Sequence, residues 1–394
     1  MTTKAPTKKA TKKKAATKKQ ATAKKGAETV APRTAANKGE TRTKAARDLD
    51  KGLEEVLEKM GHPTALPVQC SHPRNCIHTG LFMLDLITSG GYRKGRLYTL
   101  LAHSGHGKST LIQEAIAAAQ IQGVRIFHFD IEHSSTRQYM TRQGILMDDS
   151  YRLDDGSRGY YYLDPETGEE FYRMAGRMLQ KLPKDPDPET PPKTIVLVDS
   201  YEAFDSEAIN DEKNPIGVYA RMHSTWQKRL RRQIRRAGAV LVATNQIRTS
   251  GIGSFFVDQE DDAGGYALKF YSDCRVFVRM GSPKKELGGV CKGSLRTKKN
   301  RMAEPFKKAD DVRLILGQGY DRLHDRLTFL VTTGQIKRDG AYYRFGDKKL
   351  QYKRAREMMR KTKYVDRCFE IAKRMATYEK FFAYDGPVET WEEQ

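Results

Sequence analysis

The sequence has little cysteine and no long run of apolar residues. Five cysteines among 394 residues are too few for the disulfide framework that holds many small secreted proteins together. No segment is apolar over the length that spans a bilayer, and no apolar stretch follows the N-terminal lysines as it does in a signal peptide. We therefore expect a soluble, cytoplasmic protein with reduced cysteines.

One short segment, CSHPRNCIH (70–78), combines cysteine with histidine. The spacing of its four candidate ligands matches no common zinc pattern, and no second pair follows downstream. These candidates are Cys70, His72, Cys76 and His78. Reduced structural thiols are the simpler interpretation, and a bound metal ion is the alternative.

Aromatic residues are absent from residues 1–47, which consist mostly of Lys, Ala and Thr. This segment has fifteen Lys and Arg residues but two Glu residues, so it carries thirteen of the chain's 22 net positive charges. It cannot bury enough apolar surface to fold, and we expect a disordered tail. Nucleic-acid phosphate is the obvious counter-charge. The alternative is a solubilising tail with no specific partner.

Beyond the tail, the hydrophobic pattern predicts a helix over 48–60, within a segment 48–75 that ends in a linker and packs on the chain's own core or on a neighbouring copy. The segment DPETGEE (164–170) predicts a surface turn. Apolar, β-rich runs then alternate with helical patterns, which indicates an α/β fold with a mainly parallel sheet covered on both faces. The predicted strands are 97–101, 125–131, 194–198, 240–244, 275–278 and 312–316.

The most informative segment is LAHSGHGKST (101–110), which lies between a predicted strand and a predicted helix over 111–122. Such a glycine-rich turn presents backbone N–H groups to the phosphates of a nucleotide at a helix N-terminus. Lys108 would supply a positive charge and Ser109 a ligand for Mg²⁺. The predicted nucleotide-binding residues are Ser104, Gly105, His106, Gly107, Lys108, Ser109 and Thr110.

Polar residues follow three further predicted strands, at the edge where open α/β sheets bind ligands. Asp199, in VLVDS (196–200), follows the predicted strand and is expected to hold Mg²⁺, unless it starts a helix. Glu132 follows FHFDI and is a candidate for orienting or deprotonating the attacking water, unless it is a solvated strand end. Gln246 and Arg248 end a third strand, where an amide can sense a γ-phosphate or cap the loop.

Together these segments resemble the RecA family of recombinases. The resemblance spans roughly residues 76–350, and NQIR followed by GGYALKFY is more specific than the phosphate loop. It implies a RecA-type P-loop ATPase core that uses ATP and Mg²⁺. The segments that carry it are 78–110, 129–133, 196–200, 217–222, 245–248, 264–271 and 300–319.

The resemblance assigns further roles. It makes Glu132 the catalytic glutamate, Gln246 the γ-phosphate sensor and Tyr139 the ring that stacks on adenine, while Thr136 replaces an Asp that reads the base. Lys299 and Arg301 would reach a neighbouring protomer's ATP, with Lys269 and Phe270 at the same interface. The residues implied in DNA binding are Ile216, Arg221, Lys228, Arg248, Ile252, Phe255, Phe256, Gly264 and Gly265.

The implied organisation is a tail (1–47), an N-terminal helix and linker (48–75), an ATPase and DNA-binding core (76–331) and a small basic C-terminal domain (332–394). The implied function is that of a DNA-stimulated ATPase which forms a helical filament on single-stranded DNA, pairs it with duplex DNA and exchanges strands. Mediator and single-strand-binding proteins are implied partners, in a bacterial or phage-infected cytoplasm. The alternatives are a RecA-fold helicase or branch-migration ATPase, and a basic DNA-coating protein without strand exchange.

Overall fold

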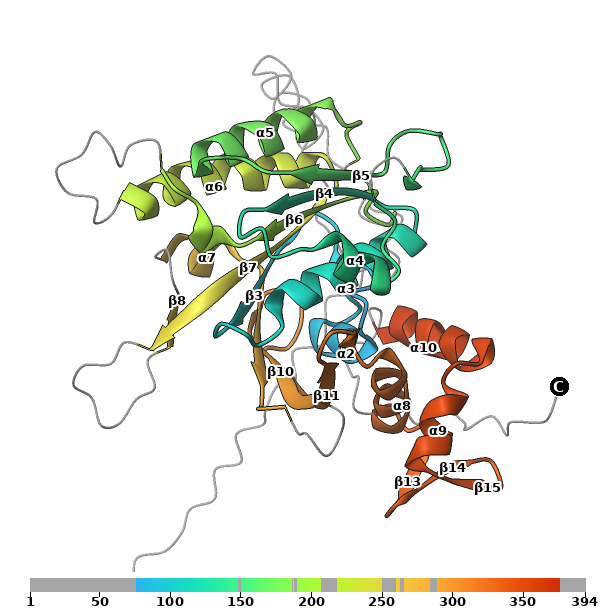
Figure 1. The fold of residues 1–394 in the computed structure, drawn as a ribbon. Coiled ribbons are helices and arrows are strands. Elements are labelled where there is room, and N and C mark those ends of the chain that lie inside the picture. The colour runs from blue at the N-terminus through green and yellow to red at the C-terminus, as the bar shows by residue number, and fades with distance from the viewer. Residues whose placement is uncertain are drawn as a thin grey trace, which may run out of the picture. The chain divides into compact units, whose positions relative to one another are not determined.

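A computed structural model of the chain describes residues 76–147, 150–185, 187, 190–206, 218–249, 260–262, 266–283 and 289–375. Its largest sheet has ten strands, and β8 (Glu260–Asp262) pairs with β7 alone. The other nine follow one path across the sheet (Figure 1). Along it they are β12 (Gly319–Tyr320), β11 (Lys308–Ile315), β10 (Val290–Asn300), β9 (Cys274–Met280), β3 (Leu97–Ala102), β7 (Val240–Thr249), β6 (Thr194–Asp199), β4 (Arg125–Asp130) and β5 (Tyr160–Leu163).

The sheet is mainly parallel, as the sequence predicts. Every neighbouring pair from β9 to β5 is parallel, while β10, β11 and β12 add an antiparallel edge. All six predicted strands are present, and the one predicted over 312–316 is β11 in this antiparallel edge. The prediction missed β5 and β10. The pattern of β10 is obscured by lysines and arginines that point away from the core.

Helices cover both faces of the sheet (Figure 1). Alternate residues of β6 show why this is necessary, because Ile195 and Leu197 belong to one buried cluster whereas Val196 and Val198 belong to another. The first cluster includes α2 (Phe82–Thr88) and α3 (Lys108–Ile121). The second includes α5 (Gly168–Lys181) and α6 (Val218–Arg236). Both faces of the parallel strands are therefore buried, as expected for this class.

The prediction of a surface turn over 164–170 is wrong in its second half, where α5 begins at Gly168. The Thr167 hydroxyl accepts a hydrogen bond from the N–H of Glu170, and the Glu170 carboxylate accepts one from the N–H of Glu166. The first bond satisfies an N–H group that the first helical turn leaves unpaired, and the second ties the chain before the helix to that turn. The same polar residues that suggest a turn thus cap a helix.

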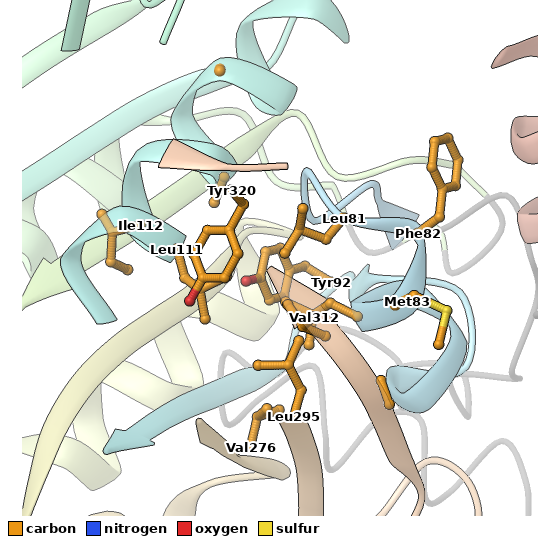
Figure 2. Close-up of a cluster of buried hydrophobic side chains, with 14 of the residues drawn as sticks. Leu81, Phe82, Met83, Tyr92, Leu111, Ile112, Val276, Leu295, Val312 and Tyr320 are labelled. Carbon is orange, nitrogen blue, oxygen red and sulfur yellow. The ribbon is translucent and has the colours of Figure 1, made fainter. Parts of the chain in front are cut away.

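Figure 2 shows the first cluster where α2, α3 and the antiparallel edge meet. Leu111 and Ile112 of α3 lie near Tyr320 of β12, while Leu295 and Val312 come from β10 and β11. The antiparallel strands therefore close this side of the core against the helix that follows the phosphate loop.

The C-terminal elements are joined to the same core. Phe329, Met359, Tyr364 and Cys368 belong to the first cluster. α8 includes both residues of the predicted domain boundary at 331/332, and the boundary itself stays a prediction. These elements are α8 (Arg322–Thr332), the antiparallel strands β13 (Lys337–Asp339), β14 (Tyr342–Phe345) and β15 (Lys348–Gln351), α9 (Tyr352–Met358) and α10 (Thr362–Met375).

Three predicted regions lie outside the described residues: the tail, the whole of the segment 48–75 with its helix, and the end of the chain beyond 375. Among the helices that are described, none combines the length and the apolar character needed to cross a membrane.

Candidate functional site

The predicted phosphate loop joins the end of β3 to the start of α3. Lys108 is buried, and its Nζ donates to the carbonyl oxygens of Ala102 at 3.3 Å and His103 at 3.2 Å. The ammonium group is therefore held inside the loop by its own backbone. Ser109 and Thr110 follow in the first turn of α3, where N–H groups and the helix dipole favour an anion.

Gly107 shows why the loop needs glycine at its end. It precedes α3 with φ of +80°, and a Cβ atom there would lie 2.8 Å from the Tyr320 hydroxyl. That hydroxyl donates to the Gly107 carbonyl oxygen at 3.3 Å. Tyr320 of β12 thus packs against the phosphate loop, and any side chain at position 107 would displace Tyr320.

His106 ties the same loop to β9. Its Nδ1 accepts a hydrogen bond from the N–H of Met280 at 3.2 Å, which leaves the proton of the neutral ring on Nε2. Burial lowers the pKa of His106, and the positive charges of His103 and Lys108 lower it further. The ring is therefore neutral near pH 7.

Asp199 lies at the carboxyl end of β6, level with Asp130 on β4. Both are buried. The Thr244 hydroxyl donates to Asp199 at 2.5 Å and the Ser134 hydroxyl donates to its other oxygen at 3.0 Å. Tyr162 donates to Asp130 at 3.2 Å. Each buried carboxylate is thereby satisfied by hydroxyls, which fixes its orientation at the edge of the sheet.

Glu132 follows β4 and is exposed. The Ser200 hydroxyl donates to its Oε1 at 2.6 Å. The backbone N–H of Glu132 also donates to the carbonyl oxygen of Asp199 at 3.1 Å. The position of this carboxylate therefore depends on the strand that carries Asp199.

Gln246 lies on β7 directly beside Ala102, the last residue of β3. Its N–H donates to the Glu202 carboxylate at 3.2 Å. The carboxyl ends of four neighbouring parallel strands, β3, β7, β6 and β4, thus bring together the predicted residues around the phosphate loop. These residues are Lys108, Glu132, Asp199 and Gln246.

Tyr139 lies on the short helix α4 (Arg137–Arg142) and is half-buried. Thr136 begins this helix, and its hydroxyl accepts a hydrogen bond from the N–H of Tyr139 at 3.4 Å. The threonine therefore caps the helix that carries the candidate adenine-stacking ring.

Lys299 and Arg301 lie near the amino-terminal ends of β9 and β3, opposite the ends that carry the phosphate loop. Lys299 pairs with Arg275 on β9, which is level with Thr99, three residues before the end of β3. Its Nζ donates to the carbonyl oxygens of Lys269 at 2.8 Å and Phe270 at 3.0 Å. Burial lowers the pKa of Lys299 to about 8, and the charge of Arg301 adds to this shift.

These carbonyl groups end α7 (Tyr266–Tyr271), where a helix attracts cations. Arg301 Nη2 donates to the carbonyl oxygen of Phe270 at 3.1 Å, and its guanidinium lies 6.0 Å from the centre of the Phe270 ring. The Phe270 side chain is 64% exposed. The structure thus gathers the four predicted interface residues into one group, separate from the phosphate loop.

Most of the predicted DNA-binding residues lie outside the described residues, namely Ile216, Ile252, Phe255, Phe256, Gly264 and Gly265. Arg248 lies on β7, which continues three residues beyond the end of β3 and pairs with β8 (Figure 1). Residues 247–249 and 260–262, which lie among the predicted DNA-binding residues, therefore form a two-stranded ribbon.

Arg221 and Lys228 are exposed on α6. The four-residue spacing of Met222, Trp226, Leu230 and Ile234 predicts a buried stripe on the other face of this helix. Met222, Leu230 and Ile234 are buried, and Trp226 is half-buried. The two basic residues are accordingly available at the surface of the helix.

Of the candidate zinc ligands, Cys70 and His72 lie outside the described residues. Cys76 is in β1 (Cys76–Ile77), which pairs with β2 (Tyr92–Arg93), and His78 contacts Asp85 through its Nδ1. Within the described part of the chain, no three His, Cys, Asp or Glu side chains are grouped to hold a metal ion.

Sequence reasoning missed four polar partners of the site: Ser134, Ser200, Glu202 and Thr244. Ser200 and Thr244 are next to residues that the motifs single out, so adjacency was an available signal. For Ser134 and Glu202 the sequence offers no comparable signal, because their contacts depend on how loops fold over the sheet edge.

A parallel sheet with a glycine-rich phosphate loop between its central strand and a helix defines a P-loop nucleotide-binding protein of the α/β class. The RecA N-terminal domain family matches residues 47–321. Similar proteins include "Protein RecA" of Aquifex pyrophilus, 29% identical over 80% of this chain and 87% of the relative. "Protein RecA" of Francisella tularensis subsp. novicida is 29% identical over 77% of this chain and 81% of the relative. The chain belongs to the RecA family.

Proposed function

We propose that this protein is an ATP-dependent DNA recombinase, which assembles as a helical filament on single-stranded DNA and exchanges strands with a homologous duplex. One observation carries the proposal: the residues predicted to bind phosphate, activate water and sense phosphate lie at the carboxyl ends of neighbouring strands, and the strand of Gln246 continues to Arg248 and pairs with β8. Nucleotide state and DNA contact are thereby joined through β7.

In this proposal the phosphate loop binds ATP. Backbone N–H groups from Ser104 to Thr110 and the charge of Lys108 hold the phosphates, while Tyr139 stacks on the base. Mg²⁺ fits the donor set, because Ser109 lies in the first turn of α3 and the buried Asp199 carboxylate is fixed by two hydroxyls. When bound, it would neutralise phosphate charge.

Glu132 acts on water in this scheme. Its exposed carboxylate, oriented by Ser200, accepts a proton from the water that attacks the γ-phosphate. Gln246 contacts the γ-phosphate and adjusts β7 when that phosphate leaves. The N–H of Gln246 donates to the Glu202 carboxylate, and this hydrogen bond fixes the backbone of β7 beside the nucleotide site.

DNA binds at the far end of β7. Arg248 meets a phosphate, the apolar residues Ile252, Phe255 and Phe256 contact bases, and Gly264 and Gly265 let the chain turn. Arg221 and Lys228, exposed on α6, add phosphate contacts.

Head-to-tail assembly is supported by the separation of two surfaces, the phosphate loop and the group formed by Lys269, Phe270, Lys299 and Arg301. Lys299 and Arg301 lie together at the end of α7, and in this proposal their positive charges reach a neighbour's ATP. Phe270 is exposed beside them. A contact between two different surfaces generates a filament when the rotation between neighbouring protomers does not close into a ring.

Electron microscopy with single-stranded DNA and a slowly hydrolysed ATP analogue tests this proposal. Helical filaments together with strand exchange in solution would support it. Closed rings with unwinding activity would favour a helicase or branch-migration ATPase, and amorphous coats without DNA-stimulated hydrolysis would favour a DNA-coating protein. Either of these results would overturn the proposal.

A further inference from the structure

A second pocket lies outside the nucleotide site. It has a volume of about 290 Å³ and is formed by α3, α4, the β11–β12 turn, α8 and α9. No residue of the phosphate loop lines it. Its lining is unusual in composition, because it includes five arginines: Arg142, Arg322, Arg326, Arg356 and Arg360.

The positive charges of this pocket exceed its negative charges by three, since Glu114 and Asp321 are the acidic residues that line it. Each of these carboxylates is already engaged by one arginine. Arg322 Nε donates to Glu114 at 2.6 Å, and Arg356 donates to both oxygens of Asp321 at 2.8 Å and 2.9 Å. These ion pairs orient two guanidinium groups without neutralising the remaining three.

The remaining arginines have weaker compensation. Arg326 is half-buried, and its Nη1 donates to the carbonyl oxygen of Met359 at 3.1 Å. Burial lowers the pKa of Arg326. Within the described part of the chain no carboxylate forms an ion pair with Arg142 or Arg326, whereas Arg360, in the turn after α9, pairs with Glu357 of that helix. Like charges around one pocket repel one another, and an anion in the pocket would relieve this repulsion.

We propose that this pocket binds a phosphate group. Guanidinium groups match phosphate because their planar N–H donors engage two oxygens at once. A guanidinium carries five N–H groups, so an arginine anchored to a carboxylate keeps donors for a ligand. With Arg360 paired to Glu357, two positive charges remain in excess, which suits a dianion better than a single carboxylate.

Two sources can supply this group: free phosphate in solution and the backbone of DNA. The pocket joins α3, which begins at the phosphate loop, to α8 and α9 of the C-terminal elements. A bound phosphate would therefore tie these elements together and stabilise the folded chain.

The test compares two double variants of the full chain. Arg142→Gln with Arg360→Gln removes two exposed arginines from the pocket. Lys353→Gln with Arg354→Gln removes two exposed charges from α9 that do not line it, and serves as the matched control. Thermal unfolding is followed against inorganic phosphate, with chloride at equal ionic strength as the reference. Saturating ADP occupies the phosphate loop throughout.

The parent and the control should be stabilised by phosphate beyond the effect of chloride, and the pocket variant should need about tenfold more phosphate for the same shift. The response should persist in a Lys108→Ala background, so failure of nucleotide binding would not hide it. Equal duplex affinity of the two double variants would identify free phosphate as the ligand, and weaker duplex binding by the pocket variant would identify the DNA backbone. A parent without a phosphate-specific shift, or equal losses in both variants, would overturn the proposal.

Discussion

The Ser200 hydroxyl is hydrogen-bonded to the Glu132 carboxylate, with 2.6 Å between the two oxygens. Ser200 is buried whereas Glu132 is exposed. Ser200 follows Asp199, the candidate Mg²⁺ ligand, so the end of β6 carries one candidate carboxylate and contacts the other. In the proposed mechanism Ser200 is a positioning residue that acts through Glu132.

Ser200→Ala should lower kcat for ATP hydrolysis by roughly tenfold with little change in KM, because a hydrogen bond to a charged group contributes about 1.5–3 kcal/mol. A double-mutant cycle checks this mechanism. If Ser200 acts through Glu132, adding Ser200→Ala to Glu132→Gln should cause no further loss of kcat. Additive losses would contradict the positioning role.

Glu132→Gln and Lys108→Ala should separate hydrolysis from binding. Glutamine cannot accept the proton from water, so Glu132→Gln should bind ATP but hydrolyse it roughly 10²–10⁴ times more slowly. Lys108→Ala removes charge from the phosphate loop and should abolish tight ATP binding. Equilibrium binding of a fluorescent ATP analogue and steady-state hydrolysis measure the two effects. Hydrolysis at the parent rate by Glu132→Gln would remove Glu132 from the mechanism.

Lys299 should make filament assembly depend on pH. Its pKa is lowered to about 8 by burial and by Arg301, while a neighbour's phosphate would favour the charged form. Assembly therefore takes up a proton above about pH 8, and it should weaken as pH rises from about 7 to about 9. Lys299→Arg keeps its charge over this range and should weaken less. The critical concentration for assembly on single-stranded DNA is the measurement.

Mixing two inactive variants tests whether Lys299 and Arg301 act on the ATP of a neighbouring protomer. Lys299→Ala or Arg301→Ala should reduce DNA-stimulated hydrolysis while the isolated chain still binds nucleotide. Combining either variant with Lys108→Ala protein should restore part of the activity, since each active site then draws on two different chains. A loss of nucleotide affinity in the isolated variant would instead place these residues in the chain's own site.

The fold could be predicted where local patterns determine it. The parallel strands are apolar runs buried on both faces, and the phosphate loop has a spacing that few other structures require. The position of Lys299 could not be predicted from the residues alone, because it depends on the antiparallel register of β10 with β9. The arginine pocket is equally inaccessible to sequence patterns, since Arg142 and Arg356 meet through tertiary packing across more than two hundred residues.

Asp325 shows the same long-range dependence and leads to a stability prediction. Its carboxylate accepts hydrogen bonds from the N–H groups of Phe82 at 2.6 Å and Met83 at 3.2 Å, at the start of α2. Burial raises its pKa to about 7. The folded state therefore holds a proton that the unfolded chain releases near pH 4, and this contribution to stability is lost as pH rises from about 4 to about 7.

Asp325→Asn should flatten that part of the pH dependence, because asparagine does not titrate. The free energy of unfolding, measured with urea, should fall between about pH 5 and about pH 8. The fall should be larger in the parent than in the variant by on the order of 2–4 kcal/mol. Asp347→Asn, at an exposed turn, is the control and should retain the parent's dependence. An unchanged pH profile in Asp325→Asn would exclude this carboxyl as its source.

Residues 1–47 should contribute to DNA binding through charge alone. They carry thirteen excess positive charges and no aromatic residue. Each phosphate contact adds about 0.9 to the salt slope on duplex DNA and about 0.7 on single strands. Deleting the segment should therefore flatten the dependence of DNA affinity on salt, most clearly for duplex DNA, because the predicted core residues already hold the single strand.

ATP hydrolysis at saturating single-stranded DNA should change little after this deletion, since every predicted catalytic residue lies beyond position 100. Salt titrations of DNA binding by the full-length and truncated chains, with hydrolysis measured alongside, make the comparison. If the two slopes are identical, the tail does not contact DNA and its lysines serve solubility or targeting instead.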